Sequence, residues 1–447
     1  MKRTALFILA LMLIVSPLGS VAARNQKVES LDTVAVLSDT AATGKFNIYH
    51  WWTAGGEKEA LETIISSFKR MYPSIEPVSN AIPGGAGGAM VMKVKVLALS
   101  GKSPETFQAH PGLEIEPYLE SDMLFDLSDL WVYAGLKDRM LDGIADLCQV
   151  DGKYFIIPIG IHKTNTIFYN KHMFAEYGVA EPEGKVTWDQ LWAICDELQA
   201  KMPDGKYPFD LGDRKGWTAT QAFESIMMGT DPKIYEDFIN GNATQEQVQV
   251  VLNQFKHLMQ YVAPDHSARL WDEAAGRVVA GDYAMMMMGT WMQPFMTKQG
   301  WVYGQDYGVF SVPGTDGYFG LCIDAFVVPN DSESVENGLR CAYAIAESQT
   351  QIDFSKAKES VSPFKDTPDT IYDVLTKKFK DELTNPNIIV YPSFTHGTAL
   401  PWAASTDLHS RMTDFATSTD PDTARYAKMI TEALNEAGVE GDWDIVK

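Results

Sequence analysis

Residues 45–73, KFNIYHWWTAGGEKEALETIISSFKRMYP, contain two successive hydrophobic patterns that decide the fold. Residues 45–52 alternate as in a half-buried strand, and a Thr-Ala-Gly-Gly turn follows. From Glu57 the apolar side chains recur at helical spacing until Tyr72 and Pro73 end the helix. The stretch therefore predicts a strand, a turn and a helix, which is the repeating unit of an α/β domain.

The same alternation continues beyond this unit. A second strand near 75–78 leads to a glycine-rich turn, a helix over 90–99 and a short strand over 107–110. This order predicts an α/β lobe with a largely parallel sheet.

A second lobe is expected because the chain, at 447 residues, is too long for a single core. At 156–170 the pattern becomes an extended crossover segment, and from there to about residue 300 it is mostly helical. Four methionines at 285–288 predict a short buried strand. A further strand is expected over 319–329 and a helical tail at 424–438.

The amino terminus indicates export. Residues 1–23 have the basic head, apolar run and small-residue exit of a signal peptide, and no cysteine marks a lipoprotein. Residues 24–44 are interpreted as a flexible spacer. No later segment reaches 18 uninterrupted apolar residues, so we expect a soluble periplasmic or otherwise extracytoplasmic protein.

Charge and residue spacing exclude several classes of protein. A formal net charge of −22 argues against nucleic acid and anionic membranes as partners. The scattered histidines and cysteines match no metal motif, so neither a metal nor a cofactor is expected. Sequence alone leaves open one disulfide or four buried thiols among Cys148, Cys195, Cys322 and Cys341.

The glycine cluster at 84–88 could be a phosphate loop, but no Lys-Ser/Thr follows it. Gly84 and Gly85 therefore predict a turn at a helix start whose free N–H groups can meet a ligand oxygen; a simple tight turn is the alternative.

Aromatic and planar polar side chains gather at strand ends and turns. In SPETFQAHPG (103–112), Gln108 and His110 share one face of a strand that Pro111 stops at once. Sugars are recognised by such mixtures, because their C–H faces pack on aromatic rings and their hydroxyls bond planar or charged groups. Any single tryptophan taken alone is more simply explained as part of the core.

The chain resembles the extracellular solute-binding proteins of sugar ABC importers over residues 45–440. The general motifs are FKRMYP (68–73), IFYNKHMFAEYGV (167–179), TWDQL (187–191) and VVAGDYAMMMMGTW (278–291). Motifs similar to the periplasmic glucose/mannose-binding members are YHWWTAGGEKEAL (49–61), PGGAGG (83–88), ETFQAH (105–110), IHKTN (161–165), LGDRKGW (211–217), CIDAF (322–326), the Lys358 segment and THG (395–397).

The resemblance implies the two-lobe periplasmic-binding-protein fold of the class II type, with a hinged ligand cleft between the lobes. It implies an N-lobe over 45–161 with 322–362, and a C-lobe over 163–318 with 365–447. The ligand-binding residues implied are Trp51, Trp52, Glu57, Gln108, His110, Trp217, Trp291, Asp324, Lys358 and His396, with Gly84 and Gly85 beside them. Thr290 departs from the family pattern, in which an Asp commonly precedes the tryptophan.

These features favour a non-enzymatic, monomeric protein that binds a monosaccharide or short oligosaccharide and presents it to the membrane subunits of an ABC permease. An exported carbohydrate-active enzyme is the alternative from another class. The same fold binding another solute is a third interpretation.

Overall fold

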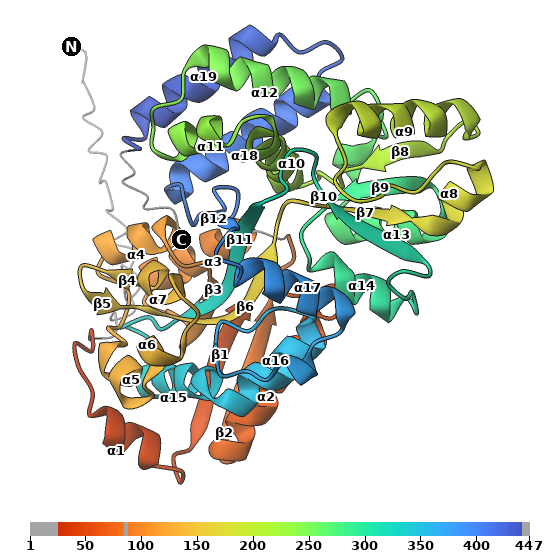
Figure 1. Ribbon diagram of the computed structural model, residues 1–447. Helices are drawn as coiled ribbons and strands as arrows, with labels where there is room; N and C mark the ends of the chain where they lie inside the picture. The colour runs from red at the N-terminus through yellow and green to blue at the C-terminus, as the bar shows by residue number, and fades with distance from the viewer. Residues whose placement is uncertain (1–25, 85–87, 440–447) are drawn as a thin grey trace, which may run out of the picture.

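The computed structural model describes residues 26–84 and 88–439, in which the chain forms two large sheets with helices around each, and one small two-stranded sheet (Figure 1). One sheet has six strands in the order β12-β11-β3-β1-β2, with β6 paired to β11. The other has four strands in the order β10-β7-β9-β8. We call the six-stranded sheet and its helices the first lobe, and the four-stranded sheet and its helices the second lobe.

The first lobe begins with the predicted strand and helix alternation. Its first elements are β1 (Gly44–His50), α2 (Glu57–Met71), β2 (Ile75–Ala81), α3 (Gly88–Leu99) and β3 (Thr106–Ala109). Short elements follow: α4 (Glu116–Glu120), α5 (Ser128–Tyr133), α6 (Leu136–Arg139), α7 (Ile144–Leu147), β4 (Gln149–Val150), β5 (Lys153–Tyr154) and β6 (Ile156–Lys163). Helix α2 has the predicted limits because Leu61, Ile64 and Phe68 form one buried stripe.

The second lobe is built mainly from residues 166–311. Its elements are β7 (Thr166–Asn170), α8 (Lys171–Tyr177), α9 (Trp188–Lys201), β8 (Tyr207–Asp210), α10 (Trp217–Thr230), α11 (Pro232–Ile239), α12 (Gln245–Leu258), α13 (Trp271–Ala280), β9 (Tyr283–Met287), α14 (Met292–Lys298) and β10 (Tyr307–Ser311). Every residue of β9 is buried, which confirms the buried strand expected from the methionine run.

The last third of the chain contributes to both lobes. Its elements are β11 (Tyr318–Val327), α15 (Val335–Ala346), α16 (Ser348–Lys358), α17 (Val374–Leu383), β12 (Ile389–Pro392), α18 (Trp402–Thr417) and α19 (Thr423–Glu436). Helices α15 and α16 pack on α2, whereas α18 and α19 pack on α10 and α12 (Figure 1). The chain therefore passes between the lobes after β6, after β10 and again between α16 and α18.

The six-stranded sheet is only partly parallel. Strand β1 is parallel to β2 and β3, as predicted, but β11 is antiparallel to both β3 and β6. The pairing of β11 with β6 shifts register between Asp324 and Ala325. Such bulges re-aim a side chain, and here the displaced residue is a candidate ligand partner.

Part of the segment interpreted as a flexible spacer is structured. Within 24–44, Thr33–Ser38 form helix α1, which Asp32 caps at its amino end. Leu37 is buried in the first lobe, and the backbone N–H of Val28 donates to the carbonyl of Asn330. This short amphipathic helix is ordered by tertiary contacts that the local sequence does not reveal. The predicted signal peptide, residues 1–23, lies outside the described residues.

Candidate sugar-binding site

Side chains from both lobes meet around one cavity. Those that line it are Trp52, Glu57, His110, His162, Trp217, Trp271, Trp291, Cys322, Asp324, Lys358 and His396. Eight of the predicted site residues are in this set, although they come from segments far apart in the chain. The space left inside is about 30 Å³, roughly room for two water molecules at about 10–15 Å³ each.

Asp324 lies at the register shift of β11 and is held at both oxygens. The amide Nε2 of Gln108 donates to Oδ1 at 3.0 Å, and Nε2 of His162 lies 3.2 Å from Oδ2. Burial raises the pKa of Asp324, but the bond from His162 and the positive charge of Lys358 outweigh it and bring the pKa to about 2. Asp324 is therefore a carboxylate that can only accept hydrogen bonds.

Gln108 does not line the cavity, contrary to the expectation that its amide faces a ligand. It is fully buried, and its Oε1 accepts the backbone N–H of Trp51 at 3.2 Å while its amide nitrogen faces Asp324. Trp51 also lies behind the cavity wall, where its ring contacts His110 at a centroid distance of 5.0 Å. Both residues can position the wall of the cavity, and neither forms it.

Glu57 and Lys358 form a buried ion pair at the edge of the cavity. Nζ of Lys358 lies 3.2 Å from Oε1 of Glu57, whose Oε2 accepts the backbone N–H groups of Thr53 and Ala54 at 3.0 Å each. Lys358 also lies 5.2 Å from the ring centroid of Trp52. The turn before Glu57 is thus ordered around its carboxylate.

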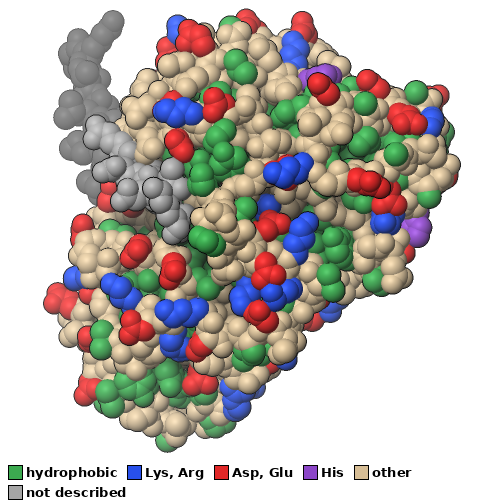
Figure 2. Space-filling view, in the orientation of Figure 1, with side chains coloured by type: hydrophobic (Ala, Val, Ile, Leu, Met, Phe, Trp, Pro, Cys, Tyr) green, Lys and Arg blue, Asp and Glu red, His purple; other side chains and the backbone are tan. Residues whose placement is uncertain are grey.

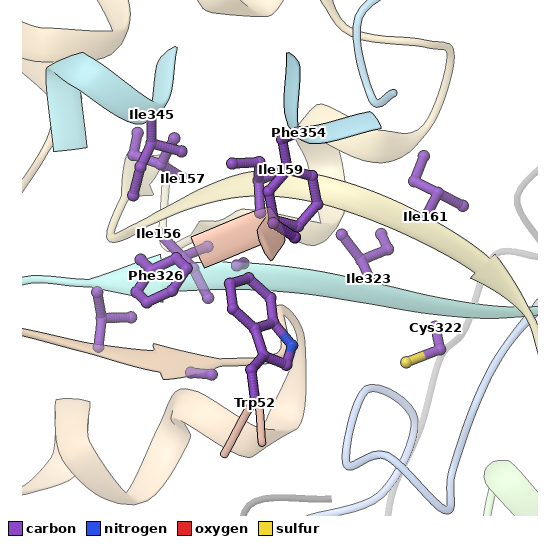
Figure 3. Close-up of a cluster of buried hydrophobic side chains, with 14 of the residues drawn as sticks. Trp52, Ile156, Ile157, Ile159, Ile161, Cys322, Ile323, Phe326, Ile345 and Phe354 are labelled. Atoms are coloured by element: carbon purple, nitrogen blue, oxygen red, sulfur yellow. The ribbon is translucent and has the colours of Figure 1, made fainter. Parts of the chain in front are cut away.

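Trp52 belongs to both the core and the cavity wall. Its ring packs against Phe326 and Phe354 at centroid distances of 5.5 and 5.3 Å, within the apolar cluster drawn in Figure 3. Only 2% of Trp52 is exposed. The tryptophan is therefore held by the core while it also lines the cavity.

The second lobe supplies an aromatic wall. The ring of Trp291 lies 5.9 Å from that of Trp217 and 5.2 Å from that of His396. Gly289 permits this arrangement, because a Cβ at that position would come within 2.3 Å of the Trp291 ring.

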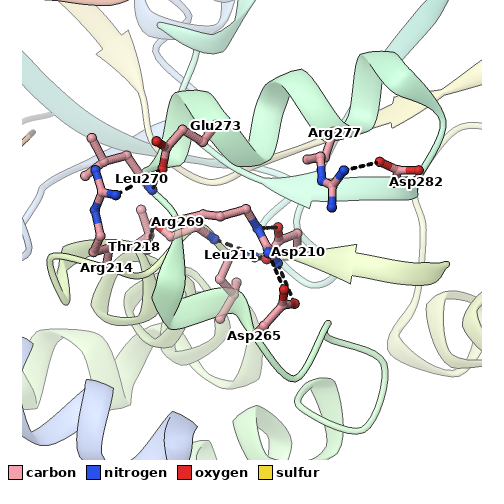
Figure 4. Close-up of polar contacts among 11 residues, drawn as sticks. Asp210, Leu211, Arg214, Thr218, Asp265, Arg269, Leu270, Glu273, Arg277 and Asp282 are labelled. Carbon is pink, nitrogen blue, oxygen red and sulfur yellow. Dashed lines mark hydrogen bonds and ion pairs between the residues drawn. The ribbon is translucent and has the colours of Figure 1, made fainter. Parts of the chain in front are cut away.

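Trp271, which the sequence interpretation missed, completes the wall at the start of α13. Just before it, Arg269 donates to Asp210 at 2.9 Å and pairs with Asp265 at 2.6 Å, so the start of the helix is tied to the end of β8 (Figure 4). Trp271 could have been found as an aromatic residue at the start of a predicted helix. It was missed because none of the family motifs in the sequence includes this position.

Two histidines that line the cavity, His110 and His396, lie edge to face with ring centroids 5.6 Å apart, and their pKa values are shifted in opposite directions. Burial lowers the pKa of His110, but the adjacent carboxylate of Glu114 and the Cys322 thiol raise it by more, to well above its usual value. The pKa of His396 is held well below its usual value by burial and by the charge of His110, and its Nδ1 lies 2.8 Å from the hydroxyl of Ser393. The cavity thus offers a cationic donor beside a neutral imidazole.

Gly84 lies close to the second lobe and does not line the cavity. Gly84 has a φ of +152°, and a Cβ there would lie 3.9 Å from Cε of Lys215. Gly85 lies outside the described residues.

The four cysteines are buried free thiols, which answers the question that the sequence left open. Among residues 26–84 and 88–439, no group of three or more His, Cys, Asp or Glu side chains could hold a metal ion. In the same ranges, no helix has both the length and the apolar character needed to span a bilayer.

Known sequences are similar to most of the chain. Residues 52–344 match the family described as bacterial extracellular solute-binding protein. An uncharacterized ABC transporter extracellular-binding protein of Pyrococcus horikoshii is 35% identical over 434 residues, covering 96% of this chain and 95% of the relative. A probable sugar-binding periplasmic protein of Brucella melitensis is 28% identical and covers 82% of this chain and 86% of its own length.

Solved structures share the fold. The bacterial solute receptor AcbH, described as having an exclusive preference for β-D-galactopyranose, superposes with a TM-score of 0.74 at 17% identity, covering 89% of this chain and 99% of the receptor. A chitin oligosaccharide binding protein also superposes with a TM-score of 0.74, at 18% identity, covering 88% of this chain and 99% of that protein. The predicted two-lobe fold is thereby confirmed. The chain belongs to the bacterial extracellular solute-binding proteins, as the sugar-binding component of an ABC importer.

Proposed function

We propose that this protein captures one monosaccharide of the glucose, galactose or mannose type between its lobes and delivers it to an ABC permease. The observation that carries the proposal is the single cavity in which the carboxylate of Asp324 faces the aromatic wall around Trp291. A pyranose has hydroxyls at its edge and C–H groups on its faces. It can therefore bond the first lobe while it packs against the second.

Charged groups around this narrow cavity favour discrimination between sugars. Asp324 and the pair of Glu57 and Lys358 are buried and held by neighbours, so they do not rearrange to suit a ligand that lacks a hydroxyl. A site built to bond a particular hydroxyl can reject an analogue without it by about 10⁴-fold. The proposal includes Trp291 and Trp52 as the rings nearest the sugar faces.

Sugar entry requires the lobes to separate. The present space of about 30 Å³ is far smaller than a pyranose ring. The crossings after β6 and β10 are suited to a hinge, because a few residues at element ends can absorb the change in backbone angles. The small size of the cavity favours a single ring, whereas a short oligosaccharide would need more space between the lobes. The carbohydrate ligands in the descriptions of AcbH and the chitin oligosaccharide binding protein support a sugar of either length.

A carbohydrate-active enzyme is less well supported. A glycosidase needs one carboxyl group that remains protonated as a general acid near neutral pH. With a pKa near 2, Asp324 is ionised throughout that range. Glu57 is bonded to two backbone N–H groups and to Lys358, which fixes it as a structural acceptor.

Export to the outer face of the membrane is part of the proposal. The family and its relatives are extracellular or periplasmic, and residues 1–23 have the pattern of a signal peptide. We propose that the mature protein is a monomer and that the closed, sugar-loaded form is the one that engages the permease.

The test is a thermal-shift screen of the purified protein over glucose, galactose, mannose, xylose, arabinose and maltose, followed by calorimetric titration of the best ligand. A binding protein gains stability with ligand concentration and binds one sugar per chain. Chromatography of the same mixtures should recover every sugar unchanged. Hydrolysis products, or no stabilisation by any sugar, would overturn the proposal.

A further inference from the structure

A continuous chain of hydrogen bonds leads from the second lobe to the Asp324 carboxylate through His162. Nδ1 of His162 lies 3.2 Å from the hydroxyl of Thr290, and its Nε2 lies 3.2 Å from Oδ2 of Asp324. The backbone N–H of Lys163 donates to the same threonine hydroxyl at 3.2 Å. Both side chains are buried, with 1% of His162 and 2% of Thr290 exposed.

The direction of each bond follows from the groups at the two ends. The Lys163 N–H can only donate, so the Thr290 oxygen accepts that bond and its own hydrogen is free to point at His162. The Asp324 carboxylate can only accept, so Nε2 of His162 carries the hydrogen and Nδ1 accepts from Thr290. One neutral tautomer of the imidazole satisfies every contact. Burial also lowers the pKa of His162, which is consistent with a neutral ring.

The other oxygen of the Asp324 carboxylate, Oδ1, is held by Gln108. The Gln108 oxygen accepts the N–H of Trp51, so its amide nitrogen must face Oδ1 of Asp324. Each carboxylate oxygen has one protein donor and retains accepting capacity toward the cavity. The two bonds fix the plane of the Asp324 carboxylate, and both of its oxygens can still accept a hydrogen bond from a ligand.

We propose that His162 is a positioning residue, held in its Nε2–H tautomer by Thr290, that fixes the plane of the Asp324 carboxylate so that it accepts two neighbouring hydroxyl groups of the sugar. This inference extends the proposed function, because it assumes that Asp324 meets the ligand. The sequence interpretation missed His162, since every residue of β6 is buried and no alternation marks the side that faces the cavity.

Thr290 links the hydrogen bonds of His162 and Asp324 to the aromatic wall around Trp291. It lies one residue before Trp291, and its backbone N–H donates to the carbonyl of Lys163 at 2.9 Å. The ring of His162 also meets that of Trp291 edge to face at 5.6 Å. The same short segment thus orients a hydrogen-bonding group and a stacking group of the site.

The first experiment needs no sugar. In ¹⁵N-labelled protein at pH 7, the His162 signals, assigned by their loss in His162→Gln, should show Nε2 protonated and Nδ1 unprotonated. In Thr290→Val, which removes the hydroxyl at nearly constant shape, Nε2 should stay protonated toward Asp324, while the Nδ1 signal should shift to the position of a ring nitrogen that accepts no hydrogen bond. Thr290→Ser should restore the wild-type pattern. A doubly protonated ring or the Nδ1–H tautomer in the wild type would overturn the inference.

The second experiment measures the affinity for the sugar that stabilises the protein most. Thr290→Val should weaken binding at least about fivefold, as expected for one lost hydrogen bond, and Thr290→Ser should bind within about twofold of the wild type. Thr315→Val, which removes a buried hydroxyl that donates to the Val312 carbonyl, is the matched control and should bind normally. Unchanged affinity in Thr290→Val would refute the positioning role. If no sugar bound the wild type, the proposed function would fail, while the tautomer measurement would still decide whether His162 is held as described.

Discussion

The amide nitrogen of Gln108 lies 3.0 Å from Oδ1 of Asp324, although 216 positions of sequence separate the two residues. The contact forms because β3 and β11 are antiparallel neighbours, which pair Gln108 with Phe326, two residues from Asp324 along β11. The site is therefore a product of sheet topology. Its strongest hydrogen-bond acceptor is oriented before any sugar arrives, which lowers the cost of ordering it on binding.

Replacing Asp324 with Asn should weaken sugar binding by at least about 2 kcal/mol. The substitution keeps the shape but removes the charge, and it places an amide donor against the N–H groups of Gln108 or His162. Calorimetric titration of both proteins with the same sugar measures the difference. Equal affinities would remove Asp324 from the ligand contacts.

The ion pair of Glu57 and Lys358 should behave as a coupled unit. In a double-mutant cycle with Glu57→Gln and Lys358→Met, each single variant leaves a buried group without its partner. The double variant should then lose less stability than the two single losses combined, with a coupling energy of about 0.5–3 kcal/mol. Urea unfolding of the four proteins tests this, and additive losses would show that the pair is not coupled.

Gly289→Ala should displace the Trp291 ring, since the new methyl group would come within 2.3 Å of it. We expect both lower stability and weaker sugar binding, with an altered tryptophan fluorescence spectrum. Gly276→Ala in α13 is the control, because its methyl group would lie 3.9 Å from Phe295 and would suit a helix. If Gly289→Ala bound sugar as well as Gly276→Ala does, the wall described around Trp291 would not contribute to binding.

The sequence predicted the elements with strong periodicity and the residues at their ends. Helix α2 has the predicted limits, and His110, Trp217 and Asp324 line one cavity as the family resemblance implied. Gln108 was expected to face the ligand, but its amide bonds Asp324 instead. Strand alternation predicts a face of the sheet, but it does not predict which side chain of an adjacent strand lies against that face.

Other features could not be predicted for related reasons. His162 lies on a strand buried along its whole length, so its orientation has no local signature. Helix α1 depends on contacts with segments about 300 residues away, such as the bond from Arg340 to the carbonyl of Val36. Both are consequences of tertiary packing.

Glu359, the residue after Lys358, should make stability depend on pH. It has a φ of +48°, and its carboxylate accepts a bond from Thr297 of the second lobe at 3.1 Å. Burial raises the pKa of Glu359 to about 7, from 4.5. The folded state then binds more protons than the unfolded state between pH 4.5 and 7, so stability should fall as pH rises through that window.

Glu359→Gln should remove this decline. Urea unfolding measures the free energy of unfolding at pH 5 and at pH 7.5. The decrease in this free energy between the two pH values should be larger in the wild type than in the variant by about 1–3 kcal/mol. Glu176→Gln, at an exposed position, should retain the wild-type difference. An undiminished decline in Glu359→Gln would assign the pH dependence to another group.

The most direct test is a crystal structure of the protein with the sugar that raises its melting temperature most. We expect one pyranose between the lobes, with neighbouring hydroxyls on Oδ1 and Oδ2 of Asp324 and a ring face against Trp291. A sugar bound on an outer surface, or one inside the cavity without contact to Asp324, would contradict the proposed site.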